Sequence, residues 1–306
     1  MIGYMDTLGH EIATARRMAN LTQEELAART GLSVRSIRNL ESSRVTRPRP
    51  ATVRLLREVL GLPAHPAVAA RIRPMQLPLE IPGFTGRSAQ LRQLDRLLEG
   101  GPRRMSSVVV CVLSGRSGIG KTALALRWAH RSAARFADGV LHVQLGGSDP
   151  VRPAVAPAEA LGGLIEALDV PGGVPCGPAA RTGLYRSALA GRRMLIVLDD
   201  ARDADQVRPL LPGVPGCMVV VTSRHRLTGL VVGEAACPVV VDELAAGEAW
   251  DLLAARLGER RLTAERAAVR EIIAHCAGVP RALAVVAARA AVQPRLPLAE
   301  VARQLR

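Results

Sequence analysis

The stretch Gly115-Arg116-Ser117-Gly118-Ile119-Gly120-Lys121-Thr122 has the spacing G-x-x-x-x-G-K-T of a phosphate-binding loop. Residues 108–113, just before it, form a β-branched apolar run that predicts a buried strand, and residues 123–129 predict a helix. Glycines let the backbone of such a loop turn its N–H groups inward around phosphate oxygens, and the helix N-terminus adds partial positive charge. The residues expected to surround a phosphate group in this way are Gly115, Gly118, Ile119, Gly120 and Ala123.

Lys121 is the only lysine in the chain. A compact ammonium group fits inside a ring of backbone amides, whereas a planar guanidinium fits poorly. Lys121 can therefore contact β- and γ-phosphates, and the Thr122 hydroxyl can hold Mg²⁺. The alternative is a glycine-rich turn that matches by chance, which the flanking strand and helix and the placement of the sole lysine disfavour.

The composition describes a globular chain of 306 residues, long enough for two or three domains, with 48% hydrophobic residues and 2% aromatics. A net charge of +14 permits binding to an anionic partner such as nucleic acid or nucleotide. The five cysteines are scattered without a C-x-x-C pair, so we expect neither a disulfide framework nor a zinc site. The N-terminus lacks the apolar core of a signal peptide, and no apolar run approaches the roughly 18 residues of a membrane span. We therefore expect a cytoplasmic protein.

Two further apolar runs end in polar residues. Residues 194–198 predict a buried strand followed by Asp199 and Asp200, where Asp199 can hold Mg²⁺ through water and Asp200 can orient an attacking water. The alternative is a strand followed by a capping aspartate. Residues 218–223 predict another strand, after which Arg224 can sense the γ-phosphate. The candidate catalytic residues are therefore Asp199, Asp200 and Arg224, and the candidate metal ligands are Thr122 and Asp199.

The N-terminal residues 8–62 predict four or five short helices. Thr22 and Glu25 have the spacing of a capping box, Gly31 marks a tight turn, and Ser33 is placed to cap the next helix. Two short helices joined by a glycine-bearing turn have the layout of a helix-turn-helix module.

Residues 21–41 closely resemble the XRE (phage repressor-like) family of DNA-binding modules. The resemblance implies that the helix after the turn enters the major groove, and arginine and asparagine can pair with guanine and adenine there. The implied base contacts come from Arg35, Arg38 and Asn39, and the residues implied near phosphates or at the start of the helix are Gln23, Ser33, Ser36 and Arg44. The alternatives are a solvated polar face and a protein-binding module. Because one such module covers few base pairs, we expect a dimer or higher oligomer on DNA.

From residue 84 onward the chain resembles the NB-ARC branch of the STAND NTPases, and in particular the actinobacterial transcriptional regulators of the AfsR type. The stretches that carry the resemblance are Phe84-Thr85-Gly86-Arg87, residues 115–122, residues 198–200, residues 222–224 and Gly278-Val279-Pro280. The resemblance implies that Phe84, Gly86 and Arg87 lie along adenine and ribose, that Arg224 senses phosphate and that Pro280 packs on adenine. Family members bind ADP, exchange it for ATP, oligomerise and hydrolyse slowly. Ser88 stands where the family usually has an acid, and the family's winged-helix and C-terminal repeat domains are not seen before the sequence ends.

The sequence thus predicts a multidomain protein. We expect an all-α helix-turn-helix head over residues 1–62, a proline-rich linker over 63–83, an α/β P-loop domain with a parallel sheet covered on both faces over 84–243, and an α-helical subdomain over 244–306. In the last of these, helices are predicted over 246–257, 263–277, 280–291 and 298–305. The expected function is a DNA-binding transcriptional regulator switched by ADP and ATP, with Mg²⁺ and at most slow ATPase activity. The alternatives are a P-loop kinase or true ATPase, and a signalling or defence scaffold whose head binds protein.

Overall fold

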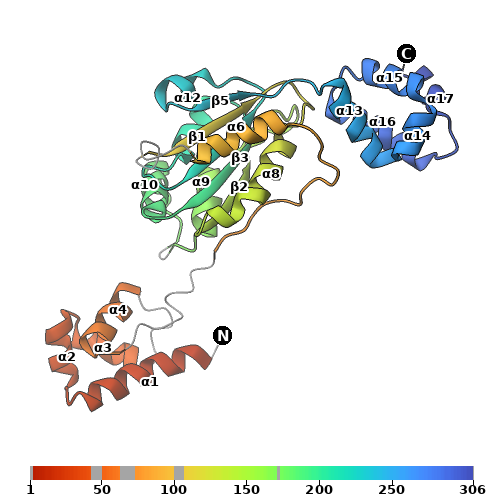
Figure 1. The fold of residues 1–306 in the computed structure, drawn as a ribbon. Coiled ribbons are helices and arrows are strands. Elements are labelled where there is room, and N and C mark those ends of the chain that lie inside the picture. The colour runs from red at the N-terminus through yellow and green to blue at the C-terminus, as the bar shows by residue number, and fades with distance from the viewer. Residues whose placement is uncertain (1–2, 43–49, 63–72, 100–106, 171–172, 306) are drawn as a thin grey trace. The chain divides into compact units, whose positions relative to one another are not determined.

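The computed structural model describes residues 3–42, 50–62, 73–99, 107–170 and 173–305. Contacts within the chain divide it into two compact units, residues 1–72 and residues 73–306, each with its own hydrophobic core (Figure 1). Residues 63–72 of the predicted linker lie outside the described residues, and so does Arg44.

The first unit contains the helices α1 (Gly3–Met18), α2 (Gln23–Thr30), α3 (Val34–Glu41) and α4 (Pro50–Val59). The predicted capping box of α2 is confirmed: Glu25 N donates to Thr22 Oγ1 at 3.1 Å, and Thr22 N donates to Glu25 Oε2 at 2.7 Å. Gly31 ends α2 with φ +67°, and the Ser33 hydroxyl accepts from Ser36 N at 3.1 Å, which caps α3. The fully buried side chains that the helices share are Ile12, Leu26, Ile37 and Leu56.

The second unit is built on a five-stranded parallel sheet, as predicted. Its strand order is β2-β3-β4-β1-β5, so the central strand β4 lies between β3 and β1, and β1 pairs with strands from distant parts of the sequence. The strands are β1 (Val109–Ser114), β2 (Gly139–Gln144), β3 (Met194–Ala201), β4 (Met218–Ser223) and β5 (Cys237–Val240). Because every pair is parallel, the carboxyl ends of all five strands lie at one edge of the sheet.

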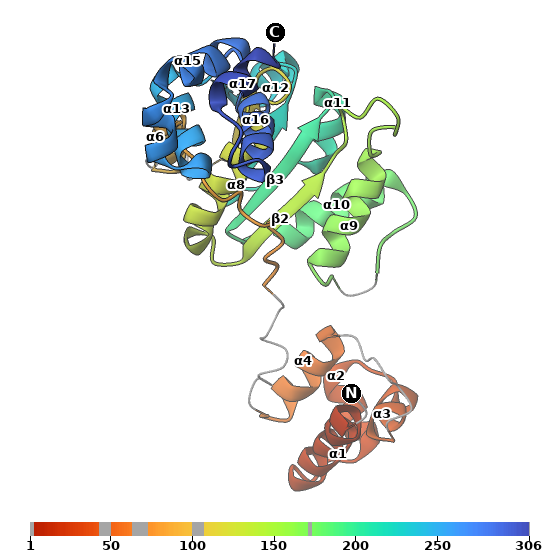
Figure 2. The same ribbon diagram turned by 90° about the vertical axis from the view of Figure 1, so that its right-hand side faces the viewer.

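Helices cover both faces of this sheet, as predicted (Figures 1 and 2). α6 (Ser88–Glu99) and α8 (Lys121–Ser132) pack on the face that carries Cys111 and Leu113. α9 (Pro157–Ala167) and α10 (Pro178–Leu189) pack on the opposite face, with the short helices α11 (Ala204–Val207) and α12 (Thr228–Gly233). The alternation of neighbouring residues between the two cores follows from the period of two in a strand.

The C-terminal residues form a bundle of five helices with a separate core. The helices are α13 (Ala246–Leu257), α14 (Glu259–Ala264), α15 (Arg266–His275), α16 (Pro280–Val292) and α17 (Leu298–Arg303). The single helix predicted over 263–277 is therefore wrong at its start, because the chain breaks at Glu265, whose φ of −124° and ψ of 43° are not helical. Leu262 turns into the core from α14 and is fully buried, which explains why the apolar pattern gave no sign of the break.

Residues 73–84 lie against the sheet unit, and we call this segment the strap. Met75 pairs with Val140 as a parallel bridge, with hydrogen bonds of 2.8 Å from Val140 N to Pro74 O and 3.1 Å from Gln76 N to Val140 O. Farther along, Pro78 O lies 2.8 Å from Nε2 of His130 on α8, and Glu80 forms an ion pair with Arg127 of the same helix. The strap therefore extends the sheet beyond the edge strand β2, runs along α8 and ends at Phe84.

Candidate nucleotide-binding site

The glycines of the phosphate-binding loop are required by its backbone. Gly118 and Gly120 have φ of +74° and +94°, in the left-handed region that favours glycine. A Cβ on Gly115 would lie 2.3 Å from Val241 O, because the loop passes closely under the end of β5. α8 then begins at Lys121, so its first N–H groups face the space above the loop.

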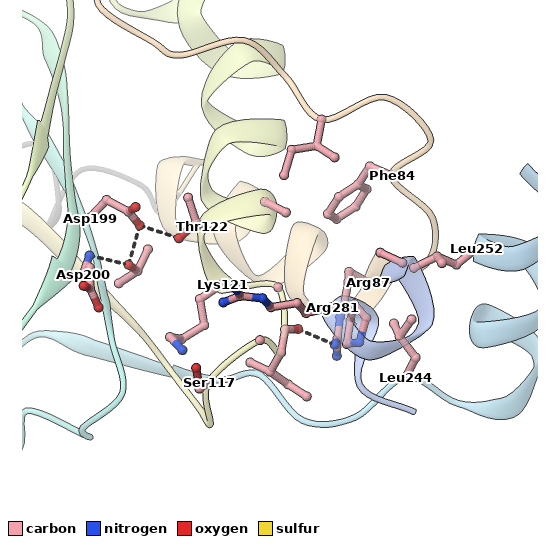
Figure 3. Close-up of a pocket in the computed structure, with 18 of the residues that line it drawn as sticks. Phe84, Arg87, Ser117, Lys121, Thr122, Asp199, Asp200, Leu244, Leu252 and Arg281 are labelled. Atoms are coloured by element: carbon pink, nitrogen blue, oxygen red, sulfur yellow. Dashed lines mark hydrogen bonds between the residues drawn. The ribbon is translucent and has the colours of Figure 1, made fainter. Parts of the chain in front are cut away.

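A cavity of about 530 Å³ opens above this loop, within the range of small-molecule sites (Figure 3). Figure 3 shows apolar residues such as Phe84 and Leu252 on one side and Asp199 on the other, with Lys121 between them. Predicted residues that line the cavity are Phe84, Arg87, Gly118, Ile119, Gly120, Lys121, Thr122, Ala123, Asp199, Asp200, Arg224 and Pro280. The cavity thus has an apolar end suited to a base and a polar end suited to phosphates.

Two predicted residues, Gly86 and Gly115, do not line the cavity. Each of these glycines allows another segment of the chain to lie close to its backbone, since a Cβ at either position would lie 2.4 Å or less from a neighbouring atom. The sequence motif therefore included positions that shape the backbone as well as positions that face the cavity.

The polar end of the cavity is held together by Asp199. Its Oδ1 accepts from the Thr122 hydroxyl at 2.8 Å and from the Thr222 hydroxyl at 2.6 Å, and the residue is 3% exposed. Asp200 has a left-handed backbone with φ +58°, and the pairing of β3 with β4 shifts between Leu198 and Ala201. Neighbouring residues of a regular strand point to opposite faces of the sheet, whereas at this irregular strand end both acids line the same cavity and bond to different partners.

The Asp200 carboxylate is bonded to the loop after β2. Its Oδ2 accepts from Ser148 N at 3.0 Å and from the Ser148 hydroxyl at 2.7 Å. The Asp200 backbone N donates to Thr222 Oγ1 at 2.8 Å. Asp200 therefore lines the cavity with a carboxylate that is already oriented by protein hydrogen bonds.

Lys121 lies folded over the loop. Its Nζ donates to Gly115 O at 2.9 Å and to Arg116 O at 3.0 Å. Burial lowers the pKa of Lys121, the positive charge of Arg224 lowers it further, and the carboxylates of Asp200 and Asp199 oppose both effects. An anionic phosphate group in the cavity would stabilise the ammonium form, which makes this buried cation well suited to such a ligand.

Thr122 and Asp199 supply oxygen atoms of the kind that bind magnesium, and a bound ligand would have to supply the other oxygen atoms of the site. Among the residues that the structure describes, no group of three or more His, Cys, Asp or Glu side chains could hold a metal ion. Mg²⁺ is commonly held by one or two protein oxygens together with phosphate oxygens and water. The Thr122–Asp199 pair at the phosphate end, in which Asp199 is buried and Thr122 half-buried, fits that pattern.

Several residues at the cavity were not predicted. The Thr85 hydroxyl lines the cavity and is buried with no hydrogen-bond partner among the described residues. Buried polar groups in proteins are normally hydrogen-bonded. Arg281 follows Pro280 directly, and its backbone N donates to Gly118 O at 3.1 Å, which joins α16 to the phosphate-binding loop. Both residues lie next to predicted ones: Thr85 belongs to the stretch 84–87 that carries the family resemblance, and Arg281 follows Pro280 in the first turn of α16. Their positions in the sequence could therefore have indicated that they line the cavity. Other unpredicted lining residues include Ser117, Gln144, Ser148, Leu244, Leu252 and Arg256.

The predicted DNA-facing residues lie on and near α3 in the first unit. Arg35 and Arg38 are exposed and Asn39 is half-buried. Gln23 Nε2 donates to Glu41 Oε2 at 2.7 Å, and Arg38 Nε lies 3.5 Å from Gln23 Oε1, so part of this face is already organised by internal hydrogen bonds. The hydroxyls of Ser33 and Ser36 lie 2.8 Å apart at the start of α3.

Residues 12–65 match the helix-turn-helix family HTH_3. The parallel sheet and the phosphate-binding loop define a P-loop NTPase fold, and the match shows that this fold follows an N-terminal helix-turn-helix domain. The chain is 40% identical over 259 residues to the regulatory protein AfsR of Streptomyces coelicolor, a match that covers 80% of this chain and 25% of that protein. It is also 40% identical over 253 residues to AfsR of Streptomyces griseus, with coverage of 80% and 25%. The predicted resemblance to AfsR-type regulators is thus confirmed.

The chain spans about a quarter of the length of these relatives (25%). Among solved structures, Cdc6p from Pyrobaculum aerophilum is similar in fold with a TM-score of 0.51 and 17% identity, over 72% of this chain and 65% of that chain. None of the helices in the described ranges has the length and apolar character needed to cross a membrane.

Proposed function

We propose that this chain is a sequence-specific DNA-binding transcriptional regulator whose state is switched by ADP and ATP. The observation that carries the proposal is that one cavity is lined both by the phosphate-binding loop and by α13 and α16 of the helical bundle. A ligand in that cavity contacts both parts, so its binding energy can favour one arrangement of them over another. The match to a helix-turn-helix family and to AfsR regulators supports DNA as the macromolecular partner.

The proposed roles of the residues follow their positions. Lys121 and the loop amides bind the phosphates, Thr122 and Asp199 hold Mg²⁺, and the apolar side chains of Phe84 and Pro280 contact the base. Mg²⁺, when bound, supplies charge neutralisation between the phosphates. Asp200 orients water, and Arg224 contacts the terminal phosphate. We propose slow hydrolysis at most, with the domain limits expected from the sequence.

In the head, we propose that Arg35, Arg38 and Asn39 contact base edges. A single recognition helix contacts only a few base pairs, so the proposal includes a dimer or higher oligomer on DNA. Two tethered heads can raise affinity by roughly 10²–10⁴ through effective concentration.

The experiment that tests the proposal begins with the nucleotide that copurifies with the full chain, identified by chromatography after denaturation. ADP and ATP binding and retardation of genomic DNA fragments at low salt are then measured on the same preparation. Bound adenine nucleotide together with nucleotide-dependent retardation is the expected result. Turnover well above once per minute would instead favour an enzyme, and nucleotide binding without any DNA retardation would favour a protein-binding scaffold.

A further inference from the structure

The Glu248 carboxylate joins the loop at the base end of the cavity to the helical bundle. Its Oε1 accepts from Arg87 N at 2.7 Å, and its Oε2 accepts from Ala245 N at 3.1 Å at the start of α13. The two oxygens of one side chain therefore bond to segments that are far apart in the sequence. The loop held in this way contains Phe84 and Thr85, which both line the cavity.

The contact between this loop and Glu248 has no spare room. Gly86 has φ +70°, and a Cβ on it would lie 2.4 Å from Glu248 Oε1 and 2.7 Å from its Cδ. The glycine thus allows the carboxylate to reach the backbone N–H of the next residue. The close fit indicates that the position of the loop depends on where the first turn of α13 lies.

Glu248 also supports a buried charge. Arg87 is 4% exposed, and burial lowers its pKa, while Glu248 is the strongest of the nearby carboxylates that oppose this shift. The Arg87 guanidinium donates to Ile119 O at 3.0 Å, on the back of the phosphate-binding loop. A continuous set of contacts therefore runs from α13 through Glu248 and Arg87 to Ile119.

We propose that Glu248 is a positioning residue of the nucleotide site, through which the helical bundle sets the affinity for the base. In the observed position of the bundle, the bond from Arg87 N to Glu248 holds the loop so that Phe84 and Thr85 line the apolar end of the cavity. Movement of α13 away from the loop breaks the bond to Arg87 N and releases the base contacts, while the phosphate contacts of Lys121 stay intact. The inference rests on the proposed function in that the ligand is taken to be a nucleotide.

A purely structural role makes a different prediction. An acid at this position of a helix stabilises the helix start by accepting from the backbone N–H of the residue before the helix. Loss of such a cap would lower the melting temperature without changing which ligands bind. The test therefore compares ADP with inorganic pyrophosphate, which has the same two phosphates and lacks the nucleoside.

The affinities of ADP and of inorganic pyrophosphate are measured for the full chain and for Glu248→Ala, Glu248→Gln and Gly86→Ala, with melting temperatures recorded in parallel. Asp251→Asn, an exposed acid of the same helix, is the matched control. We expect Glu248→Ala to weaken ADP roughly tenfold, the scale of one charge-assisted hydrogen bond, and to leave pyrophosphate within about twofold. Glu248→Gln keeps one acceptor oxygen, so it should fold and show a smaller loss in the same direction.

The contact also predicts non-additivity. Gly86→Ala places a methyl group against the carboxylate and should weaken ADP much as Glu248→Ala does, whereas the double variant should be little worse than Glu248→Ala alone. Equal weakening of ADP and pyrophosphate, or no weakening of either in Glu248→Ala, would overturn the inference. A wild-type chain that binds neither ligand would instead refute the proposed function.

Discussion

Thr122 donates its hydroxyl hydrogen bond to Oδ1 of Asp199 at 2.8 Å, although 77 positions separate the two residues in the sequence. The first residue follows β1 and the second belongs to β3, and β4 lies between these strands in the sheet. Thr222 of β4 donates to the same oxygen at 2.6 Å and so closes the space between them. The two strands β3 and β4 and the first turn of α8 thus fix the position of one carboxylate oxygen at the phosphate end of the cavity.

Lys121→Ala should remove the only lysine from the loop and weaken both ADP and ATP. Loss of an ammonium that contacts phosphate should cost about 1.5–3 kcal/mol, or roughly tenfold to a hundredfold in affinity. Isothermal titration calorimetry measures the change. Arg131→Ala, on the same helix and paired with Asp95 of α6 away from the cavity, serves as the control. Unchanged nucleotide affinity in Lys121→Ala would show that the loop is not the phosphate site.

Nucleotide affinity should fall as the pH rises toward the alkaline range. Burial, followed by the charge of Arg224, lowers the pKa of Lys121, so the free protein loses this proton at a lower pH than an exposed lysine does. Phosphate binding favours the protonated form, so affinity is full below the lowered pKa and is lost as the pH rises through it. Calorimetry in buffers of different ionisation enthalpy should detect proton uptake on binding in that window. A flat profile up to the ordinary lysine pKa of about 10.4 would contradict the prediction.

Arg35→Ala and Asn39→Ala should each relax sequence preference at one base pair of the operator. Loss of one base contact should cost about 1–3 kcal/mol against the preferred sequence and much less against other sequences. Selection of bound fragments from a random library followed by titration of single-base variants measures this. Arg29→Ala, an exposed arginine of α2, is the control and should leave the preference unchanged. If both variants at α3 keep the wild-type preference, another surface reads the bases.

Gly139→Ala should detach the strap from β2. A Cβ on Gly139 would lie 2.4 Å from Pro74 O, and the φ of +116° is strained for any other residue. The expected cost is roughly 1–3 kcal/mol, the scale of a strained backbone position. Hydrogen exchange of the Val140 and Gln76 amides should speed up in the variant, because these amides bond across the same contact. Gly163→Ala, which meets nothing within 4 Å, is the control.

The sequence predicted the elements of the nucleotide unit because their signals are local. The spacing of residues 115–122 and the apolar run before Asp199 each identify a strand end, and parallel strands bring their carboxyl ends to one edge. The strand order could not be predicted in this way, because it depends on contacts between segments far apart in the chain. The break at Glu265 was missed since buried residues such as Leu262 continue the apolar pattern through it.

The finer features of the site depend on geometry that no local pattern contains. The bulge that separates Asp199 from Asp200 follows from the pairing of β3 with β4. Glu248 has the spacing of a helix-capping acid, and no local pattern indicates that its second oxygen bonds to Arg87 N. Gly86 was identified through a family motif, and its close approach to that carboxylate became visible only in the structure.

The bonds of Pro74 and Gln76 to Val140 also occupy part of the free edge of the sheet, since β2 is its outermost strand on that side. An exposed edge strand presents unpaired backbone N–H and C=O groups that can pair with a strand of another molecule. The strap takes up both backbone groups of Val140, so it protects this edge of the sheet against edge-to-edge association.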